Sequence, residues 1–266
     1  MLYVPGSQFP PERYPNVAPV RLVQTANLRA QDAPPIASMY VSSRGGAIRR
    51  LLGSAHRHVI AMRRDPQMLF GQPNEGIAEG PAMLRCATDP DIFYYQFQPF
   101  RIELPVNGSL ASWICDLVYV DRDGMVWVRE IKRTITDLQD PRYEAKLQAV
   151  NWLLSRLGWR FKPWTLEEIH GSEERQVNVA TIYFDRAAHL DDLMPRFELL
   201  ADSITDTTYG ELIRALDPSN TCRARAAVHR LIMRGRVWTD LDRLLEDWSV
   251  VRLRPEAVVT VDLPFA

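Results

Sequence analysis

The chain has 266 residues, of which 46% are hydrophobic and 24% charged, and its formal net charge at pH 7 is −1. This composition indicates a globular protein of one large or two ordinary domains and excludes collagen-like, disulfide-scaffold and wholly disordered chains. We find no apolar run near the roughly 18 residues of a transmembrane helix, and the first residues lack the pattern of a signal peptide. Three widely spaced cysteines, Cys86, Cys115 and Cys222, predict reduced thiols in a cytoplasmic protein.

The balanced charge gives no global basic field that would by itself indicate nucleic-acid binding. Two segments, residues 33–64 and 221–236, nevertheless contain several arginines and no acidic residue. Such local basic patches suit phosphate binding, and they equally suit solvated helix faces. His56 and His58 lie in the first patch, where the alternatives are metal ligands and exposed helix histidines beside arginines.

The N-terminal part is rich in proline, with seven prolines in residues 1–35. Proline fixes φ and removes a backbone donor, so we expect an extended arm with at most a short strand at residues 20–23. Apolar residues at helical spacing predict a helix over residues 46–64. Together these segments form the first expected region, a Pro-rich arm and basic helical segment over residues 1–65.

The middle of the chain reads as strands and helices in turn. Aromatic and β-branched residues predict strands over 92–104, 113–120, 125–131 and 177–184, with turns at 107–108 and 121–124. The Asp140-Pro141 pair opens a helix that Gly158 closes, and a short strand is expected over residues 160–164. This order predicts an α/β core, a mixed sheet flanked by helices, over residues 66–186.

The last part predicts a second domain over residues 187–266. Helices are expected over 190–203, 209–216 and 222–234, with Thr208 and Thr221 as N-caps, followed by an extended return at 236–240. Two short helices, a tight turn and a β return are typical of a winged-helix-like domain. Its basic helix carries the candidate DNA-binding residues Arg223, Arg225, Arg230, Arg234 and Arg236. Protein contacts through the apolar face of this helix are the alternative.

The candidate chemistry lies between residues 116 and 132. Side chains alternate along a strand, so Glu130 and Lys132 point to one side, and a facing strand brings Asp116 near Glu130. Two close carboxylates repel unless a cation lies between them, and Mg²⁺ prefers such hard oxygen ligands. A neighbouring lysine can position a water for attack on phosphorus, so the pattern predicts metal-assisted phosphodiester hydrolysis. An E-x-K triplet alone is more often a surface salt bridge, but a preceding Asp116 and a following helix make the pattern more specific.

Asp-x(13)-Glu-x-Lys on a hairpin resembles the PD-(D/E)xK restriction-endonuclease-like superfamily, and more narrowly the TnsA endonucleases of heteromeric transposases. The strand at residues 94–100, the helix segment 138–147 and the segment 160–169 are similar to the corresponding family segments. The resemblance covers roughly residues 72–253. It implies a restriction-endonuclease-like core with a C-terminal winged-helix-like domain.

The resemblance also implies roles for particular residues. Glu79, Asp116 and Glu130 would hold Mg²⁺, for which Mn²⁺ substitutes, with the backbone carbonyl of Ile131 as a further ligand and Lys132 as the catalytic lysine. Glu79 is followed by Gly80-Pro81 where the family has an uninterrupted helix, so Glu79 is expected at a helix start, and Glu75 is the competing acid.

The implied function is a Mg²⁺-dependent endonuclease that cuts the 5′ ends of a transposon in double-stranded DNA. The implied partners are a TnsB-like recombinase and a TnsC-like AAA+ ATPase, with no membrane, in a bacterial cytoplasm and on the nucleoid when bound to DNA. Two alternatives remain open: a stand-alone restriction or repair nuclease of the same fold, and a degenerate nuclease core that serves as a DNA- or partner-binding scaffold.

Overall fold

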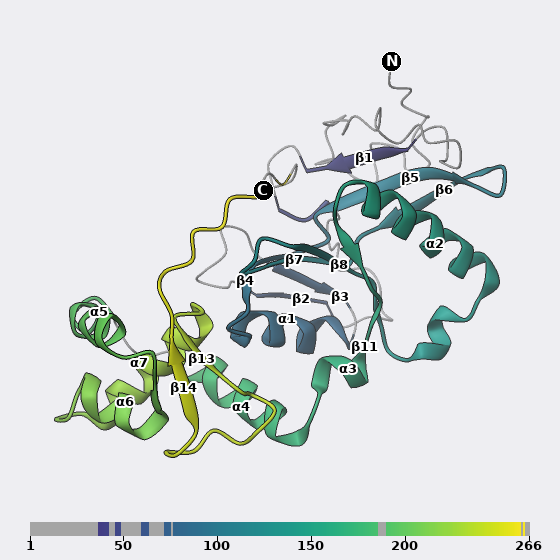
Figure 1. Cartoon of the computed structure of the whole chain (residues 1–266). Helices are drawn as coiled ribbons and strands as arrows, with labels where there is room; N and C mark the ends of the chain where they lie inside the picture. The colour runs from purple at the N-terminus through teal and green to yellow at the C-terminus, as the bar shows by residue number, and fades with distance from the viewer. Residues whose placement is uncertain are drawn as a thin grey trace. The chain divides into compact units, whose positions relative to one another are not determined.

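The computed structural model describes residues 37–42, 46–48, 60–63, 72–75, 77–185, 190–261 and 263 (Figure 1). The protein is α/β, and the chain divides into two compact units. The first unit comprises Met1–Gly80, Tyr94–Leu166 and Thr260–Ala266, and the second comprises Pro81–Phe93 and Glu167–Val259. This division differs from the boundaries expected at residues 66 and 187, because residues 81–93 and 167–186 associate with the C-terminal part. The expected arm over residues 1–35 lies outside the described residues.

The first unit is mainly β-structure. Its strands are β1 (Ser38–Val41), β2 (Ile60–Arg63), β3 (Gln72–Glu75), β4 (Ile92–Phe97), β5 (Phe100–Val106), β6 (Ser109–Ile114), β7 (Leu117–Asp121), β8 (Val126–Arg129), β9 (Ile131–Lys132), β10 (Arg160–Phe161) and β11 (Trp164–Thr165). Its helical segments are the start of α1 (Glu79–Thr88), a 3₁₀ turn (Ile135–Leu138) and α2 (Pro141–Arg156).

These strands form one mixed sheet and several smaller sheets. The mixed sheet has the order β10-β8-β7-β4, with β10 parallel to β8 and β7 antiparallel to β8. A second sheet, β1-β5-β6, is antiparallel, while β9 pairs with β11 in parallel and β2 pairs with β3 antiparallel. Because β8 and β9 follow each other across Glu130, the parallel partner strands β10 and β11 extend along both.

Turn chemistry explains where these strands end. Asn107 (φ 49°) and Gly108 (φ 78°) form the expected tight turn between β5 and β6. The strand predicted over residues 92–104 is in fact two strands in different sheets, because Gln98 (φ 48°) adopts a left-handed conformation and Pro99 follows it. The expected strand over 113–120 is also divided, at Cys115 and Asp116.

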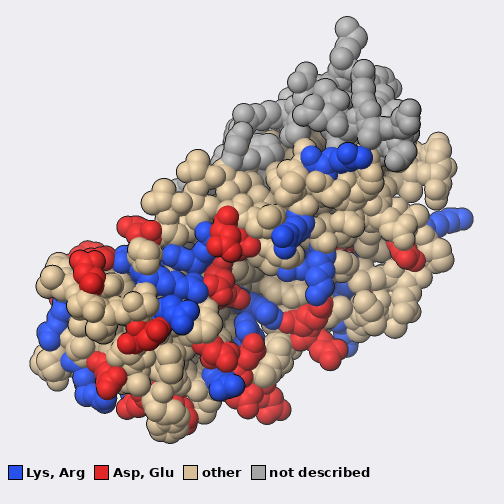
Figure 2. Space-filling view, viewed as in Figure 1, with Lys and Arg blue, Asp and Glu red and all other residues tan. Residues whose placement is uncertain are grey.

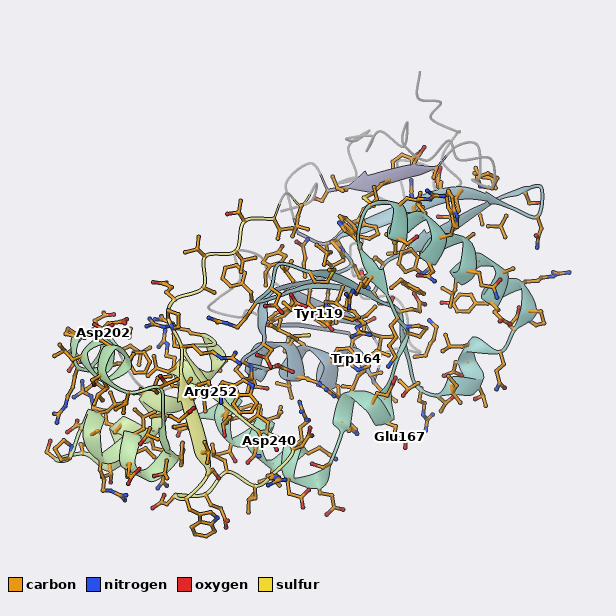
Figure 3. All side chains as sticks on the ribbon, viewed as in Figure 1. Tyr119, Trp164, Glu167, Asp202, Asp240 and Arg252 are labelled. Carbon is orange, nitrogen blue, oxygen red and sulfur yellow. The ribbon has the colours of Figure 1, made fainter. Side chains whose placement is uncertain are left out.

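An aromatic and apolar core supports the mixed sheet. Tyr119 stacks on Trp127 with ring centroids 6.1 Å apart, and Tyr119 also contacts Trp164 (Figure 3). The Arg129 guanidinium lies over these three rings at 4.8–5.3 Å and donates to the Tyr119 hydroxyl. Cation–π contacts of this kind allow a nearly buried arginine to be stable inside a strand.

The long helix α2 confirms the start that the sequence predicts. Asp140 is its N-cap and accepts hydrogen bonds from the backbone of Arg142 and Tyr143, and Gly158 (φ 76°) follows its last turn. Figure 1 shows α2 running beside the β5–β6 hairpin. Its apolar face buries Leu147, Val150, Leu153 and Leu154.

Two segments of the predicted secondary structure are wrong. The expected helix over residues 46–64 ends in a strand, since 60–63 pairs with β3, and residues 49–59 lie outside the described residues. The strand expected over 177–184 is part of a helix, α4 (Glu173–Phe184). Its N-cap Ser172 accepts from the Arg175 backbone and two glutamates occupy the first turn, and these signals precede the β-branched residues that favoured a strand.

The second unit is mainly helical. Its elements are the rest of α1, α3 (Leu166–His170), α4, α5 (Met194–Ser203), β12 (Asp206–Thr208), α6 (Tyr209–Leu216), α7 (Thr221–Met233), β13 (Val237–Thr239) and β14 (Val250–Leu253). The strands form an antiparallel sheet in the order β12-β14-β13. Thr208 is the expected N-cap of α6 and forms a capping box with Glu211, but Asn220 caps α7 in place of the predicted Thr221.

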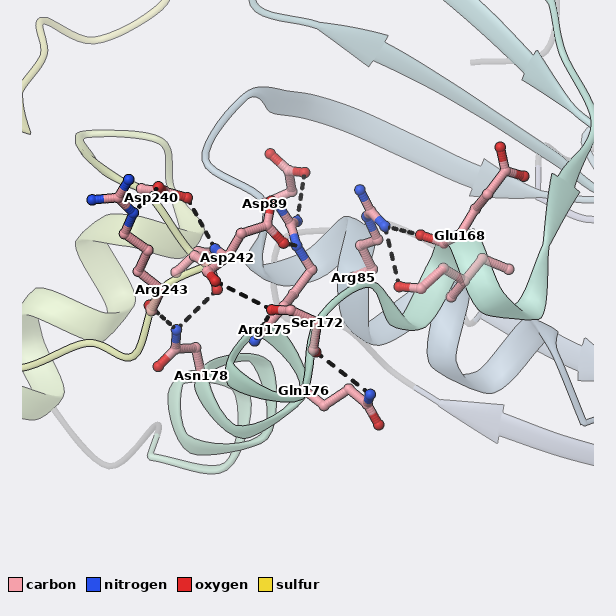
Figure 4. Close-up of polar contacts among 12 residues, drawn as sticks. Arg85, Asp89, Glu168, Ser172, Arg175, Gln176, Asn178, Asp240, Asp242 and Arg243 are labelled. Atoms are coloured by element: carbon pink, nitrogen blue, oxygen red, sulfur yellow. Dashed lines mark hydrogen bonds and ion pairs between the residues drawn. The ribbon is translucent and has the colours of Figure 1, made fainter.

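Polar contacts hold the 240–245 loop of the second unit on α4 (Figure 4). The Asn178 amide donates to the carbonyls of Leu241 and Arg243 at 2.9 and 2.7 Å and accepts from the Leu245 backbone. Arg175 donates to the Asp242 carboxylate at 2.7 Å. Asn178 is buried and both ends of its amide form hydrogen bonds with this loop, so the side chain ties the loop to α4. In the part of the chain that the structure describes, no helix is long and apolar enough to cross a membrane.

Candidate functional site

Asp116 lies in the bend between β6 and β7 rather than inside a strand as predicted. The backbone there stays connected to its neighbours, because the Asp116 carbonyl accepts from the Gln98 backbone at 3.0 Å. The Asp116 carboxylate accepts a hydrogen bond from the Ile131 backbone N–H at 2.8 Å. This bond ties the bend to the facing strand and brings Asp116 to the E-x-K triplet, as the sequence predicts.

Glu130 is buried, at 3% exposure, between β8 and β9. Its Oε2 accepts from the indole Nε1 of Trp113 at 2.6 Å. Its Oε1 accepts from the Tyr143 hydroxyl of α2 and lies 2.6 Å from the Lys132 ammonium. A buried carboxylate is expensive unless it is hydrogen-bonded, and these donors stabilise the charge and fix the orientation of the side chain.

Lys132 lies in β9 with its side chain 27% exposed. Its contact with Glu130 confirms that both side chains point to the same side of the strand. Burial lowers the pKa of Lys132, but the charges of Glu130 and Asp116 outweigh burial, so the net pKa is raised. The lysine is therefore an ammonium at neutral pH and serves as a hydrogen-bond donor rather than as a base.

Asp116 is the electrostatically strained member of the cluster. Its pKa is raised well above the ordinary value, first by removal from water and then by the charge of Glu130, with a smaller contribution from Glu79. The Lys132 charge and the hydrogen bond from Ile131 lower the pKa but do not cancel this rise. Burial of Asp116 beside a second carboxylate disfavours its ionised form, and a cation bound there would stabilise that form.

Glu79 is the first residue of α1, as predicted from the Gly80-Pro81 that follows it. Its side chain is buried, at 8% exposure, and its charge acts on Asp116. The competing Glu75 is the last residue of β3, opposite Ile60.

The Ile131 carbonyl is the other group expected beside the carboxylates. In a strand the N–H and C=O of one residue point to the same edge. Because the Ile131 N–H points to Asp116, its carbonyl faces the same side.

The oxygen atoms that could bind a divalent cation here belong to two carboxylates and one backbone carbonyl. Among the described residues no group of three or more His, Cys, Asp or Glu side chains is close enough to hold a metal ion. Mg²⁺, however, is usually bound by one or two carboxylates and completes its shell with water and substrate phosphate oxygens. Asp116 and Glu130 together with the Ile131 carbonyl fit this requirement, and Glu79 adds negative charge from nearby.

A cavity of about 860 Å³ begins at Lys132 and lies between the β5–β6 hairpin and the first turns of α2. This volume is within the range of small-molecule sites, roughly 300–1,000 Å³. Tyr143 and Lys146 of α2 line its wall. The carboxylate cluster is therefore adjacent to a space that can receive a ligand.

Three residues of this region were not predicted as functional. Trp113 and Tyr143 hold Glu130, and Lys146 lines the cavity. Tyr143 lies in the expected helix after Asp140-Pro141, where helical spacing indicates only a packing position. A polar side chain in the first turns of the helix after E-x-K is the one signal that could have indicated it, whereas Trp113 reads as an ordinary strand residue.

Two of the candidate DNA-binding arginines are engaged inside the protein. Arg236 is buried and donates to both Glu198 oxygens at 2.8 and 2.7 Å, and its guanidinium lies 5.0 Å from the Phe197 ring centroid. Arg223 lies 3.4 Å from Asp217 and also pairs with Asp192.

The other arginines of this set are more accessible. Arg225 and Arg234 are exposed and Arg230 is half-buried. Burial and the neighbouring Arg230 lower the pKa of Arg234, so these two guanidinium groups repel each other. On the face shown in Figure 2, Lys and Arg side chains are interleaved with Asp and Glu. Positive and negative charges are therefore balanced locally on this face, as they are in the chain's net charge.

Comparisons with known proteins leave the chain unassigned. No protein-family profile matches it, and no curated protein has a significantly similar sequence.

Proposed function

We propose that the protein is a Mg²⁺-dependent endonuclease that hydrolyses phosphodiester bonds of double-stranded DNA. The observation that carries this proposal is the Asp116–Glu130 carboxylate pair with Lys132 beside it, since Lys132 also lines a large cavity. A carboxyl pKa that is raised by burial and by a second carboxylate is common at catalytic sites, and it supports the proposal together with this geometry.

Each residue has a role that follows from its contacts. Asp116, Glu130 and the Ile131 carbonyl would hold the cation, which supplies Lewis-acid stabilisation of charge on the phosphate. Lys132, an ammonium oriented by Glu130, donates to the attacking water and to the phosphate oxygens. Trp113 keeps the Glu130 carboxylate in place, and Glu79 adds negative charge. The products would be a 5′ phosphate and a 3′ hydroxyl.

The second unit supports a DNA- or partner-binding role. We propose that it is a winged-helix-like domain, and its order α5-β12-α6-α7-β13-β14 with an antiparallel three-stranded sheet supports this proposal. We include Arg225, Arg230 and Arg234 in the proposed DNA surface. Arg223 and Arg236 are left out because their guanidinium groups form ion pairs within the unit.

We further propose that the enzyme is a TnsA-like subunit of a heteromeric transposase, which cuts transposon 5′ ends together with a TnsB-like recombinase and a TnsC-like ATPase. The resemblance of the Asp-x(13)-Glu-x-Lys hairpin supports this assignment. The net charge of −1 also supports recruitment by partners, since a subunit carried to its site needs no basic field to find DNA.

The test is cleavage of a plasmid carrying the transposon ends, in Mg²⁺ or Mn²⁺, with and without the two partner proteins. Wild type should cut only with the partners present, and Asp116→Asn and Lys132→Met should abolish cutting while the complex still assembles. Cutting of naked DNA by the chain alone would instead support a stand-alone nuclease. Unchanged cutting by both variants would refute the site.

A non-catalytic scaffold is the second candidate, and one observation favours it. Both oxygens of Glu130 already have donors within the protein, namely Trp113 on one side and Tyr143 with Lys132 on the other. In a scaffold these bonds are permanent, and Asp116→Asn would leave both DNA binding and partner assembly unchanged. Failure of wild type to cut in the full complex, with DNA binding retained, would establish this alternative.

A further inference from the structure

The cavity beside Lys132 has a wall of polar and cationic side chains from two elements. The β5–β6 hairpin contributes Asn107 and Ser109, and α2 contributes Arg142, Tyr143 and Lys146. Lys132 lines the same space from β9, and both Lys132 and Tyr143 contact Glu130, so the cavity is next to the carboxylate cluster.

Lys146 is a half-buried cation of this wall without a carboxylate at ion-pair distance among the residues that the structure describes. Its ammonium lies 4.6 Å from the ring centroid of Tyr143, and the Lys132 ammonium lies 5.2 Å from the same ring. Lys132 has Glu130 as its counter-ion, whereas among the described residues no carboxylate is at ion-pair distance from Lys146. Burial lowers the pKa of Lys146; the charge of Glu130 opposes this shift, and the charge of Lys132 adds to it with a smaller effect. A half-buried ammonium beside a second one is stabilised by an anion.

The acidic residues of the cavity do not supply that anion. Asp140 is the N-cap of α2 and accepts from the backbone N–H groups of Arg142 and Tyr143 at 2.8 and 3.0 Å. Asp137 accepts from the Thr134 backbone at 2.9 Å. The carboxylates of Asp137 and Asp140 therefore accept hydrogen bonds from backbone N–H groups. Arg142 is exposed and has no ion pair among the described residues. The cations of α2 are available to a ligand.

We propose that this cavity is a binding site for the DNA backbone, in which Lys146, assisted by Arg142, binds a phosphodiester next to the one that is cut. The inference rests on the proposed function for the identity of the ligand, but its support is the cavity and its charges. Lys132 belongs to both the cavity and the carboxylate cluster, so one strand can place adjacent phosphates at Lys146 and at the cluster. Tyr143 separates the two ammonium groups and keeps each at its own phosphate.

The test measures binding of a fluorescein-labelled DNA duplex to the full chain by anisotropy, in EDTA, at several salt concentrations. Lys146→Gln removes the charge but keeps the length of the side chain, and Lys146→Arg restores a cation. Arg156→Gln is the matched control, since Arg156 lies in the last turn of the same helix and outside the cavity.

Lys146→Gln should weaken binding about threefold to tenfold and reduce the slope of log affinity against log salt by about 0.9, the value for one phosphate contact. Lys146→Arg should restore most of both, and Arg156→Gln should change neither. Equal affinities and slopes for Lys146→Gln and Arg156→Gln would overturn the inference, as would the absence of any binding by wild type at low salt. Because EDTA removes the metal, the loss of DNA affinity in Lys146→Gln can be observed even if the protein never cuts DNA. If Lys146→Gln binds DNA like wild type and the protein still cuts DNA, then this inference fails while the proposed function stands.

Discussion

Removing one hydroxyl group, by Tyr143→Phe, should make the protein less stable and its cation site stronger. The Tyr143 hydroxyl donates to Oε1 of Glu130, and hydrogen bonds to charged groups contribute about 1.5–3 kcal/mol. Tyr143 is half-buried and Oε1 keeps Lys132 as a donor, so we expect the lower part of this range, a loss of about 1.5–2 kcal/mol in the free energy of unfolding.

The same bond competes with a cation for Glu130. If Oε1 must release Tyr143 before it can bind a divalent ion, then the variant avoids that cost, and about 1.4 kcal/mol corresponds to tenfold in affinity. Mn²⁺ affinity, measured by calorimetry, should therefore rise about tenfold to thirtyfold, while urea unfolding in EDTA shows the loss of stability.

Tyr94→Phe is the matched control for this experiment. Tyr94 is another partly buried tyrosine of the first unit, and its hydroxyl donates to the neutral side chain of Gln96. It should lose about 0.5–1.5 kcal/mol and leave Mn²⁺ affinity unchanged. If Tyr143→Phe binds Mn²⁺ no better than Tyr94→Phe, or is more stable than wild type, then the Tyr143 bond does not restrain Glu130 and the reasoning is refuted.

Three further predictions follow from other contacts. Because the pKa of Asp116 is raised in the folded state, the folded protein holds a proton that the unfolded chain releases. The stability of the metal-free protein should therefore fall as pH rises above the ordinary carboxyl pKa. Asp116→Asn should remove part of that fall, as measured by urea unfolding from pH 4 to 8. Arg236→Gln should cost about 1–2 kcal/mol by thermal denaturation, since the buried guanidinium loses its hydrogen bonds to Glu198 and the Arg254 carbonyl while the half-exposed Glu198 stays solvated. A change in DNA affinity without loss of stability would contradict its structural role. Gly210→Ala should destabilise the folded protein by about 1–3 kcal/mol, because the added Cβ would lie 2.9 Å from Asp247. The control is Gly80→Ala, also at the second position of a helix but with nothing within 4 Å, which should be neutral or stabilising by up to about 1 kcal/mol. Equal effects of the two variants would show that the Asp247 contact is relaxed.

Local signals in the sequence predicted much of this structure. The Asp140-Pro141 start of α2, the Thr208 N-cap of α6 and the Asn107-Gly108 turn each depend on a few neighbouring residues. The E-x-K triplet also has a local geometry, since alternation along a strand puts Glu130 and Lys132 on one side.

The failures came from competing signals and from contacts distant in the chain. The β-branched residues of 177–184 favoured a strand, but the capped start at Ser172 and packing made α4 a helix. The left-handed conformation of Gln98 could not be read from its residue type. Trp113 and Tyr143 reach Glu130 across 17 and 13 residues, and only the folded arrangement of hairpin and helix shows these bonds.

The most direct test of the central claim is calorimetric titration of the full chain with Mn²⁺, in wild type, Asp116→Asn and Glu130→Gln. A site made by the two carboxylates predicts that wild type binds the ion and that each variant loses at least about tenfold in affinity, while Glu144→Gln on the exposed side of α2 binds like wild type. Binding that is unchanged in both site variants, or absent from wild type even with duplex DNA present, would contradict the metal-dependent hydrolase and leave the scaffold in its place.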